Sequence, residues 1–554
     1  MAVALVFLIA LLAVSFALSM RDVSAEAESI SYVKVTVADV KTFIRDYASL
    51  VESNDYIPQN GVISTKENFI YLFFAGESGN YTLGANFQII REGSDGVWSS
   101  GFSATDGKDV YRYPYLASGC TLNGAGHTIL NSSTPSSSSK YTSIVGGLVC
   151  INEGTIQNLK YTFEGNLNVK KNKDDFILAN KTGLPDAVVV GGMIGVNKGT
   201  VDACTIVIGG QITAEADTSD TIVYGGGMIG YNQGDVSNCG GSNGSISCNS
   251  TITMYSDSDS GSSDAKHCSV YAGGIVGNLG GGTFYKCSIR SSGSVISADN
   301  TAMWEEGLLD AILSFLPDEL NSHTGHNGDS YIHPAGGVVG VLSGDGKLKQ
   351  CKIESAGSTL SYGMAGSGNE GCIAGGVVGV LQGTTAQGGL LHNEIVISGA
   401  LSSFFMPVDS LGGVVVAQIV EKIIDWLPSW ATNLVDLEPR GDVNVWLGAV
   451  YGKNYASKLT FKNNFIQITA DDGILDDGVD RESDDYVAHT GLLCGNSLSG
   501  LVGENNWMAR KLSECGTDMI TNNSSTTNGL KQLYIYGDGE LIVTSVSDSQ
   551  TASR

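Results

Sequence analysis

The sequence predicts an all-β fold, a parallel β-helix (β-solenoid) with a short N-terminal helical lead-in and two inserted amphipathic helices. Three observations support this prediction: a repeated glycine motif, short apolar runs rich in Val and Ile, and a spacing of roughly 35 to 60 residues between most copies. Stacked repeats bury apolar faces that no single repeat could bury alone. An antiparallel sandwich with glycine-rich turns is the alternative.

The motif consists of two glycines, two apolar residues, a further glycine in five of the six copies, and a polar turn that ends in glycine. The copies begin at Gly146, Gly191, Gly226, Gly273, Gly336 and Gly375. The apolar runs are too short for helices, so we expect strands. The glycines allow positive φ at the corners and close approach of neighbouring coils. Asn152, Asn197, Asn232 and Asn278 lie in four of the turns, and we expect these side chains to hydrogen-bond along the stack.

These residues resemble the GLUG repeat, a Gly-Gly-apolar-apolar-Gly-x-Asn-x-Gly pattern that often ends in Asn-Cys. The ending is intact at Asn238-Cys239 and partial at Cys204 and Cys287. Three upstream stretches resemble the lead-in of such proteins: Tyr81-Thr82-Leu83, Trp98 and residues 122–129. The resemblance covers about residues 80 to 400. It implies a secreted or surface protein, adhesin-like, whose repeat is not catalytic.

The same patterns divide the chain into five segments: a signal peptide (1–25), an N-terminal lead-in or cap (26–79), a β-helix with GLUG-like repeats (80–400), degenerate repeats with a helical insertion (401–515) and a C-terminal cap or tail (516–554). Apolar spacing over residues 39–51 predicts a helix that either caps the N-terminal end or packs on the flank. Residues 533–543 predict a hairpin around a Gly-Asp-Gly turn, which we expect to serve as a C-terminal cap.

Two further segments, 304–316 and 420–427, have amphipathic helical spacing, and a proline follows each. We expect them to form the two inserted helices and to be buried together against one flank of the solenoid. The alternative is a lipid- or partner-binding surface, suggested by their Trp and Leu content.

The N-terminus predicts secretion. The apolar run from Ala2 to Leu18 is short for a membrane span and lies where a secretory signal belongs, so we expect cleavage after Ser19 or Ala25 and an extracellular or cell-surface location. An uncleaved anchor is the alternative, because Lys and Arg are absent before this run. No later apolar segment is long enough for a transmembrane span. Seven sequons are candidate glycosylation sites: Asn80, Asn131, Asn180, Asn243, Asn249, Asn522 and Asn523.

The eleven cysteines are too sparse for a disulfide-dense scaffold, but they are consistent with a few disulfide bonds formed in an oxidising compartment. Cys204 and Cys239 hold equivalent repeat positions, and stacked positions lie near the roughly 4.4–6.8 Å Cα separation that a disulfide needs. Cys494 and Cys515 are a second candidate pair, which would close the last coil.

No catalytic or cofactor motif occurs in its required context. Carboxylates at Asp476, Asp477 and Asp480 are weak candidates for Ca²⁺ binding, and a solvated acidic loop is the favoured alternative. Matches to a nucleophile elbow (240–244) and a dinucleotide fingerprint (366–371) lack the surrounding strands and helices that these motifs require. We therefore expect no cofactor, Ca²⁺ excepted. The net charge of −26 argues against nucleic-acid binding, which needs a basic face.

Together these features predict a secreted, glycosylated β-solenoid that mediates adhesion or matrix interaction and presents its loops to a glycan or an extracellular protein. A β-helix carbohydrate-active enzyme (polysaccharide lyase or hydrolase) is one alternative, and a groove with two carboxylates on neighbouring coils would favour it. A filament subunit that self-associates end to end is another. An exposed terminal coil would favour the filament, and caps at both ends would argue against it.

Overall fold

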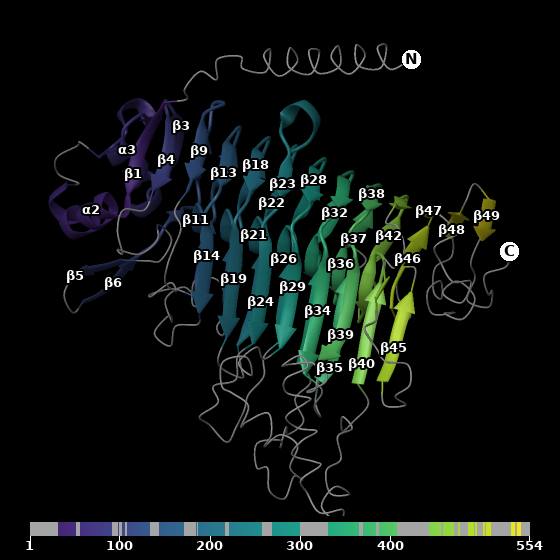
Figure 1. Ribbon diagram of the computed structural model, residues 1–554. Helices are drawn as coiled ribbons and strands as arrows, with labels where there is room; N and C mark the ends of the chain where they lie inside the picture. Colours follow the sequence, from purple (N-terminus) through teal and green to yellow (C-terminus); the bar gives the residue numbers. More distant parts are fainter. Residues whose placement is uncertain are drawn as a thin grey trace, which may run out of the picture.

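The chain winds into a parallel β-helix, which confirms the predicted fold class (Figure 1). In the computed structural model, each complete coil visits five parallel sheets in a fixed order, here named sheets I to V. The structure describes residues 31–50, 56–90, 98, 102–105, 108–132, 143–170, 184, 187–216, 221–256, 269–299, 331–364, 369–383, 387–406, 443–455, 458–469, 475–476, 486–491, 493–495, 502–504, 506–510, 533–537 and 540–543.

Sheets I and II are consecutive in each complete coil. Sheet I contains β7 (Tyr115–Leu116), β11 (Val149–Asn152), β16 (Ile194–Asn197), β21 (Ile229–Asn232), β26 (Val276–Leu279), β31 (Val339–Leu342), β36 (Val378–Leu381) and β41 (Tyr451–Asn454). Sheet II contains β2 (Val62–Ile63), β3 (Gly79–Leu83), β8 (Cys120–Asn123), β12 (Thr155–Gln157), β17 (Thr200–Asp202), β22 (Asp235–Ser237), β27 (Thr283–Tyr285), β32 (Lys347–Lys349), β37 (Gly389–Leu391), β42 (Thr460–Lys462) and β46 (Val502–Glu504).

Sheet III is the longest. It contains β1 (Tyr32–Thr36), β4 (Asn86–Ile90), β9 (Thr128–Asn131), β13 (Lys160–Phe163), β18 (Thr205–Ile208), β23 (Ile246–Cys248), β28 (Ser288–Ser291), β33 (Lys352–Ser355), β38 (Glu394–Ile397), β43 (Phe465–Ile468), β47 (Asn506–Arg510), β48 (Leu533–Gly537) and β49 (Glu540–Val543). Only β48 and β49 pair antiparallel within this sheet, which confirms the predicted hairpin.

Sheets IV and V complete each coil. Sheet IV contains β14 (Asn166–Lys170), β19 (Gln211–Ala216), β24 (Thr251–Ser256), β29 (Val295–Asp299), β34 (Thr359–Met364), β39 (Leu401–Met406) and β44 (Leu475–Asp476). Sheet V contains β10 (Ile144–Gly146), β15 (Ala187–Gly191), β20 (Ile222–Gly226), β25 (Val270–Gly273), β30 (Tyr331–Gly336), β35 (Asn369–Gly375), β40 (Val443–Gly448) and β45 (Tyr486–Gly491). A separate hairpin, β5 (Phe102–Thr105) with β6 (Lys108–Arg112), precedes β7.

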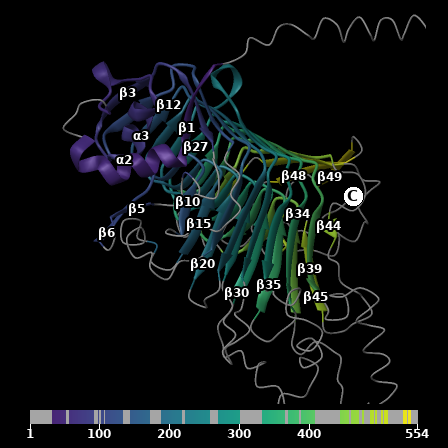
Figure 2. The ribbon, with the colours of Figure 1, turned by 60° about the vertical axis from the view of Figure 1, so that its left-hand side comes forward.

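The strands of sheet IV end at one edge of the solenoid, and the strands of sheet V begin at the same edge (Figure 2). Every connection from sheet IV to sheet V therefore starts and finishes at this edge. Residues 300–330 connect β29 to β30, and residues 407–442 connect β39 to β40. The two predicted amphipathic helices belong to these connections and lie outside the described residues. Among the helices that are described, none is long and apolar enough to cross a membrane.

The glycine motif forms the corner between sheets V and I, where the chain folds back on itself. A Cβ on Gly191 would lie 2.1 Å from the Ile194 carbonyl oxygen, and a Cβ on Gly195 would lie 2.9 Å from Cγ2 of Ile144 in sheet V. The second glycine, Gly192, faces sheet III, where its Cβ would lie 2.5 Å from Cγ2 of Ile208. The predicted close approach is confirmed, because real Cβ atoms do not approach other atoms this closely.

The predicted positive φ at the motif glycines is wrong for the leading glycine of every copy, since none of the six has a φ in that range. Positive φ occurs instead at the corner between sheets II and III, at one residue per coil. These residues are Asn158, Ala203, Asn238, Lys286, Gln350, His392 and Asn463, with φ between 51° and 57°. The leading glycines therefore serve close approach without positive φ, whereas Gly344, the last glycine of its copy, combines a φ of 55° with a Cβ position 2.3 Å from the Gly280 carbonyl oxygen.

Buried amide ladders run along the stack. Asn152 donates from Nδ2 to Oδ1 of Asn197 at 2.8 Å, and Asn197 donates in the same way to Asn232 at 2.8 Å, as predicted. Asn278 does not continue this ladder, because Leu279 is the residue in register with Asn232. Asn278 still hydrogen-bonds along the stack, but outside the amide ladder, since its Oδ1 accepts from Ser343 Oγ of the next coil at 2.9 Å.

A second ladder, which the sequence analysis did not predict, follows the corner between sheets II and III. Asn393 Nδ2 donates to Asn464 Oδ1 at 3.0 Å, and Asn464 Nδ2 donates to Asn506 Oδ1 at 2.9 Å. All three side chains are buried. In earlier coils the same corner position is occupied by cysteine, at Cys204, Cys239, Cys287 and Cys351. Each of these residues directly follows a residue of positive φ.

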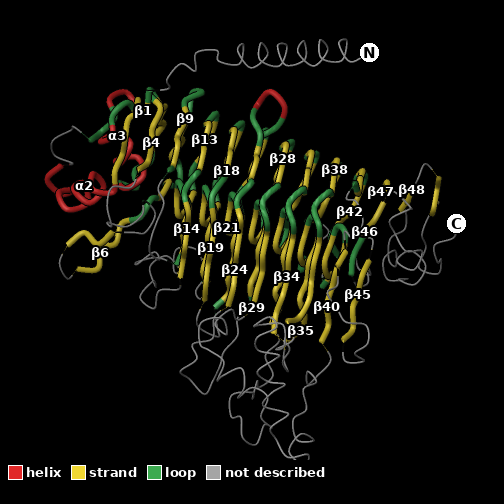
Figure 3. Tube along the Cα trace, in the orientation of Figure 1, coloured by secondary structure: helices red, strands yellow, loops and turns green. Residues whose placement is uncertain are grey.

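Helices α2 (Val37–Leu50) and α3 (Lys66–Phe74) lie at the N-terminal end of the stack, shown in red in Figure 3. The structure confirms the predicted helix over residues 39–51, now with bounds 37–50. Apolar side chains of both helices join the main core, so they cap its end. Helix α3 was not predicted from the sequence, although Thr65 at its start accepts a hydrogen bond from the backbone N–H of Asn68.

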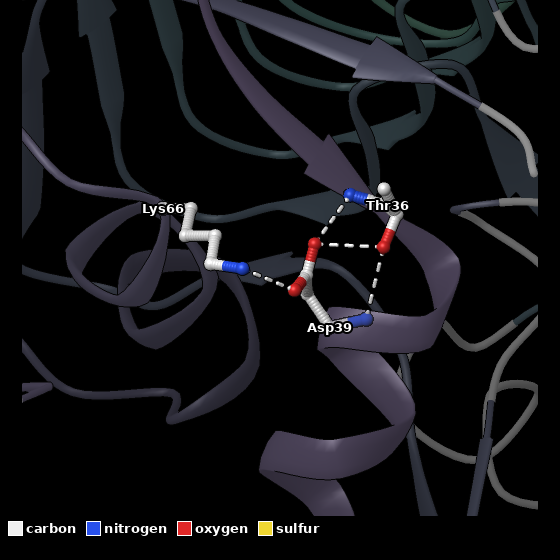
Figure 4. Close-up of polar contacts among 3 residues, drawn as sticks. All are labelled: Thr36, Asp39 and Lys66. Carbon is white, nitrogen blue, oxygen red and sulfur yellow. Dashed lines mark hydrogen bonds and ion pairs between the residues drawn. The ribbon is translucent and has the colours of Figure 1, made fainter.

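Three residues join the two helices (Figure 4). Asp39 accepts hydrogen bonds from Thr36 N (2.9 Å), Thr36 Oγ1 (2.7 Å) and Lys66 Nζ (2.6 Å). Thr36 Oγ1 accepts in return from Asp39 N at 3.1 Å, which completes a capping box. Burial acts to raise the pKa of the Asp39 carboxyl, but the hydrogen bonds from Lys66 and Thr36 outweigh it, so this pKa lies below its ordinary value.

Candidate binding surface

The outward faces of sheets II and III form a continuous surface across the tight corner between them. Alternate side chains of each strand point into the core and outward, because the side-chain period of a strand is two. The strands are parallel and in register, so each outward position repeats from coil to coil as a row. By contrast, side chains on the outward faces of sheets I and V pack against each other in two apolar clusters apart from the main core.

Sheet III carries a row of aromatic residues near its C-terminal end. Phe465 of β43 pairs in register with Trp507 of β47, and these two residues are named the aromatic row below. Phe465 is 48% exposed and Trp507 is 41% exposed. The other large apolar residues of similar exposure lie apart from this row, at Val62, Val207, Ile222 and Tyr455. Neighbouring exposed aromatic residues of this kind mark interaction sites more often than isolated ones.

A group of lysines lies on sheet II, several coils before the aromatic row. Nζ of Lys286 lies 5.0 Å from the ring centroid of Tyr285, and Nζ of Lys349 lies 5.8 Å from the same centroid. Lys349 is in register with Tyr285, and Lys347 is in register with Thr283 on the same outward side. These three lysines and Tyr285 are named the lysine cluster below.

Two ion pairs border the lysine cluster on sheet III. Arg290 Nε lies 3.5 Å from Glu354 Oε1, and Lys352 Nζ lies 3.3 Å from Glu394 Oε2. The two carboxylates lie on neighbouring coils, but both side chains are largely exposed, at 43% and 65%. Exposed carboxylates with basic partners on an open sheet face lack the desolvated, convergent arrangement that glycoside cleavage uses.

The predicted glycosylation sites lie in different environments. Asn80 in β3 and Asn249 before β24 are exposed, so both are open to modification. Asn131 is wrong as a glycosylation site, because it is 1% exposed and its Nδ2 donates to the Gly147 carbonyl oxygen at 2.6 Å. Asn243 lies in the short 3₁₀ turn η3 (Gly241–Asn243). Three sites lie outside the described residues: Asn180, Asn522 and Asn523.

The predicted Cys204–Cys239 disulfide is not formed. The two residues are neighbours in the stack, with the backbone N–H of Cys204 3.4 Å from Cys239 Sγ, but both are buried free thiols. Each sulfur instead contacts a carbonyl oxygen two residues before it, at 3.2 Å for Cys204 and 3.3 Å for Cys239. Cys494 is also buried, and its predicted partner Cys515 lies outside the described residues, so this pairing remains a prediction.

The acidic run is described only at Asp476, which ends β44. Its companions Asp477 and Asp480 lie outside the described residues, so Ca²⁺ binding by this loop remains a prediction. Elsewhere in the described part of the chain, no three His, Cys, Asp or Glu side chains come together as a metal site requires.

No family model matches the chain, and comparison with curated proteins and with solved structures found no match. The aromatic row and the lysine cluster were both missed by the sequence analysis. The available signal was the strand alternation Phe465-Ile466-Gln467-Ile468, which turns one aromatic side chain outward beside two buried isoleucines. Recognising the row also required the register to Trp507, which lies 42 residues further along the chain.

Proposed function

We propose that this protein is a secreted β-solenoid that acts in adhesion by binding extracellular glycans on the outward face of sheet III. The exposed pair Phe465 and Trp507 carries this proposal. Aromatic rings combine a large apolar surface with few rotatable bonds, and an exposed row of them provides a flat platform on which sugar rings can stack. The exposed Gln467, on the same strand as Phe465, adds a hydrogen-bonding group at its side.

Three other features support an adhesive role. The resemblance to GLUG-repeat proteins implies a surface location, the N-terminal apolar run predicts secretion, and Asn80 and Asn249 are exposed sequons. The enzyme alternative has less support, because Glu354 and Glu394 lie on an open face and each is ion-paired. The filament alternative also has less support, since α2 and α3 cap one end and the β48–β49 hairpin ends sheet III at the other.

The test is a glycan-array measurement on the mature protein, with release of reducing sugar followed in parallel. We expect Phe465→Ala/Trp507→Ala to weaken glycan binding by about 10- to 100-fold, because truncating an aromatic anchor costs about 2 kcal/mol or more. Val207→Ala is the matched control, since Val207 is 39% exposed on the same sheet, and it should bind like the wild type. Sugar release would support the enzyme instead, and equal binding by all three proteins would exclude the aromatic row.

A further inference from the structure

We propose that the lysine cluster is a site for anionic groups, so that the glycan bound by this solenoid is an acidic one that carries carboxylates or sulfates. This inference deepens the proposed function and rests on it. It assigns a chemical class to the ligand and adds a second contact region, formed by Lys286, Lys347 and Lys349 around Tyr285.

The three lysines of the cluster form no described ion pair, although the chain as a whole is strongly acidic. The protein carries 57 acidic and 31 basic residues, so carboxylates that could pair with a surface ammonium group are abundant. Arg290 and Lys352, on the adjoining strands, both have such partners. Among the ion pairs formed by the described residues, none includes a lysine of the cluster.

The arrangement of the three lysines brings like charges together. Like charges that lie close together repel one another, along one strand as well as between neighbouring strands. Lys347 and Lys349 lie two residues apart on one outward side, and Lys286 and Lys349 both approach the Tyr285 ring. The ring face attracts each cation, but it cannot neutralise either of them. An anionic group between the ammonium groups would remove their repulsion, and this makes the cluster complementary to an anion.

The lysine cluster and the aromatic row lie close enough for one glycan chain to contact both. Lys349 lies on β32 and the aromatic row begins on β43, two coils further on and across one corner. At about 4.8 Å per coil, the cluster and the row lie about 10 to 15 Å apart along the axis, within the reach of one glycan chain. Nucleic acid fits less well, because its charges are spaced about 1.7 Å apart along the duplex axis and would extend past three lysines onto an acidic surface.

The experiment measures binding of the full mature protein to immobilised polygalacturonate, chondroitin sulfate and a neutral dextran at several salt concentrations. We expect the wild type to prefer the two acidic glycans and to lose them as salt rises. Lys347→Gln/Lys349→Gln should weaken acidic binding at least about tenfold at low salt and leave dextran binding unchanged. Lys34→Gln/Lys160→Gln removes the same charge from exposed positions on other strands and should stay within about twofold of wild type.

The outcomes separate the two proposals. Binding of dextran but of neither acidic glycan would overturn the inference and leave the proposed function standing, whereas no glycan binding at all would overturn both. Equal weakening by the control pair would show a general charge effect and overturn the site. A salt-sensitive dimer in the absence of glycan, seen by light scattering and abolished by Lys347→Gln/Lys349→Gln, would mean that the cluster docks a second acidic copy of the chain, and this too would overturn it.

Discussion

At the scale of single residues, the leading glycines of the repeat mark positions where a side chain would clash with its surroundings. Gly192 lies at the corner between sheets V and I, beside the Ile208 side chain of sheet III. Its Cβ would lie 2.3 Å from the Gly227 carbonyl oxygen in the next coil and 2.5 Å from Ile208. The first of these atoms belongs to the backbone, so it cannot move aside without disturbing the next coil.

We therefore expect Gly192→Ala to lower the free energy of unfolding by about 3 kcal/mol or more, because overpacking against backbone forces the coils apart. Gly281→Ala is the matched control within another copy of the motif. The nearest atom to its Cβ would be 3.6 Å away, which is ordinary contact. Chemical denaturation of both variants checks the prediction, and similar midpoints would contradict it.

At the scale of elements, the N-terminal cap depends on Asp39. The folded pKa of Asp39 lies below its ordinary value of 3.8, so the carboxylate stabilises the cap at pH values above 3.8. This contribution is lost as the pH falls through the folded pKa. Its size is about 1 kcal/mol or less, since the group is partly exposed and acts as a helix cap.

The corresponding prediction compares thermal midpoints of the wild type and Asp39→Asn over a range of pH. We expect the wild type to be more stable near neutral pH and the difference to shrink as the pH is lowered below 3.8. Asp46→Asn removes an exposed carboxylate that pairs with its neighbour Arg45, and it should change the midpoint little at any pH. A difference that persists unchanged at low pH would show that the carboxylate charge is not the cause.

At the scale of the whole molecule, the solenoid buries its thiols. Nine of the eleven cysteines are described, and all nine are buried and outside any described disulfide bond. Burial raises the pKa of Cys120 and Cys204 to about 12 each and that of Cys248 to about 11. The hydrogen bond from Cys287 lowers the pKa of Cys239 and Cys351, but these two thiols are buried as well. Buried thiols do not react with disulfide reagents until the coils open.

We expect a chromogenic disulfide reagent at pH 8 to modify at most two cysteines of the native protein, Cys268 and Cys515, and at least nine after denaturation. Val207→Cys provides the positive control, because Val207 is 39% exposed and a thiol there should react at once. Fewer than nine thiols in the unfolded protein would contradict the prediction and restore the disulfide staples expected from the sequence.

The sequence was sufficient to predict the coiled fold, but not the packing between sheets or the residues that meet on the surface. Glycine spacing predicts stacking, because crowding at one corner recurs once per coil. It does not say which atoms cause the crowding, so the packing of sheet V on sheet I could not be predicted. Asn131 illustrates the same limit, since its sequon is local whereas its burial depends on Gly147 in the next coil. The aromatic row joins Phe465 to Trp507 only through strand register, which a single sequence does not reveal.

The edge at which sheet IV connects to sheet V bears on how the sequence can change during evolution. The six copies of the motif, from Gly146 to Gly375, each place a pair of glycines at the corner between sheets V and I, so recombination between two of them would add or remove one complete turn and leave both flanking turns in register. Connections of very different length already occur at that edge, and the only register irregularity among the described sheet V pairs lies at Tyr331 and Ile332, while the glycines at the other end of these strands stay in register. The gene can therefore lengthen by whole turns, and new segments can be acquired at this edge, while the wall of the tube stays the same.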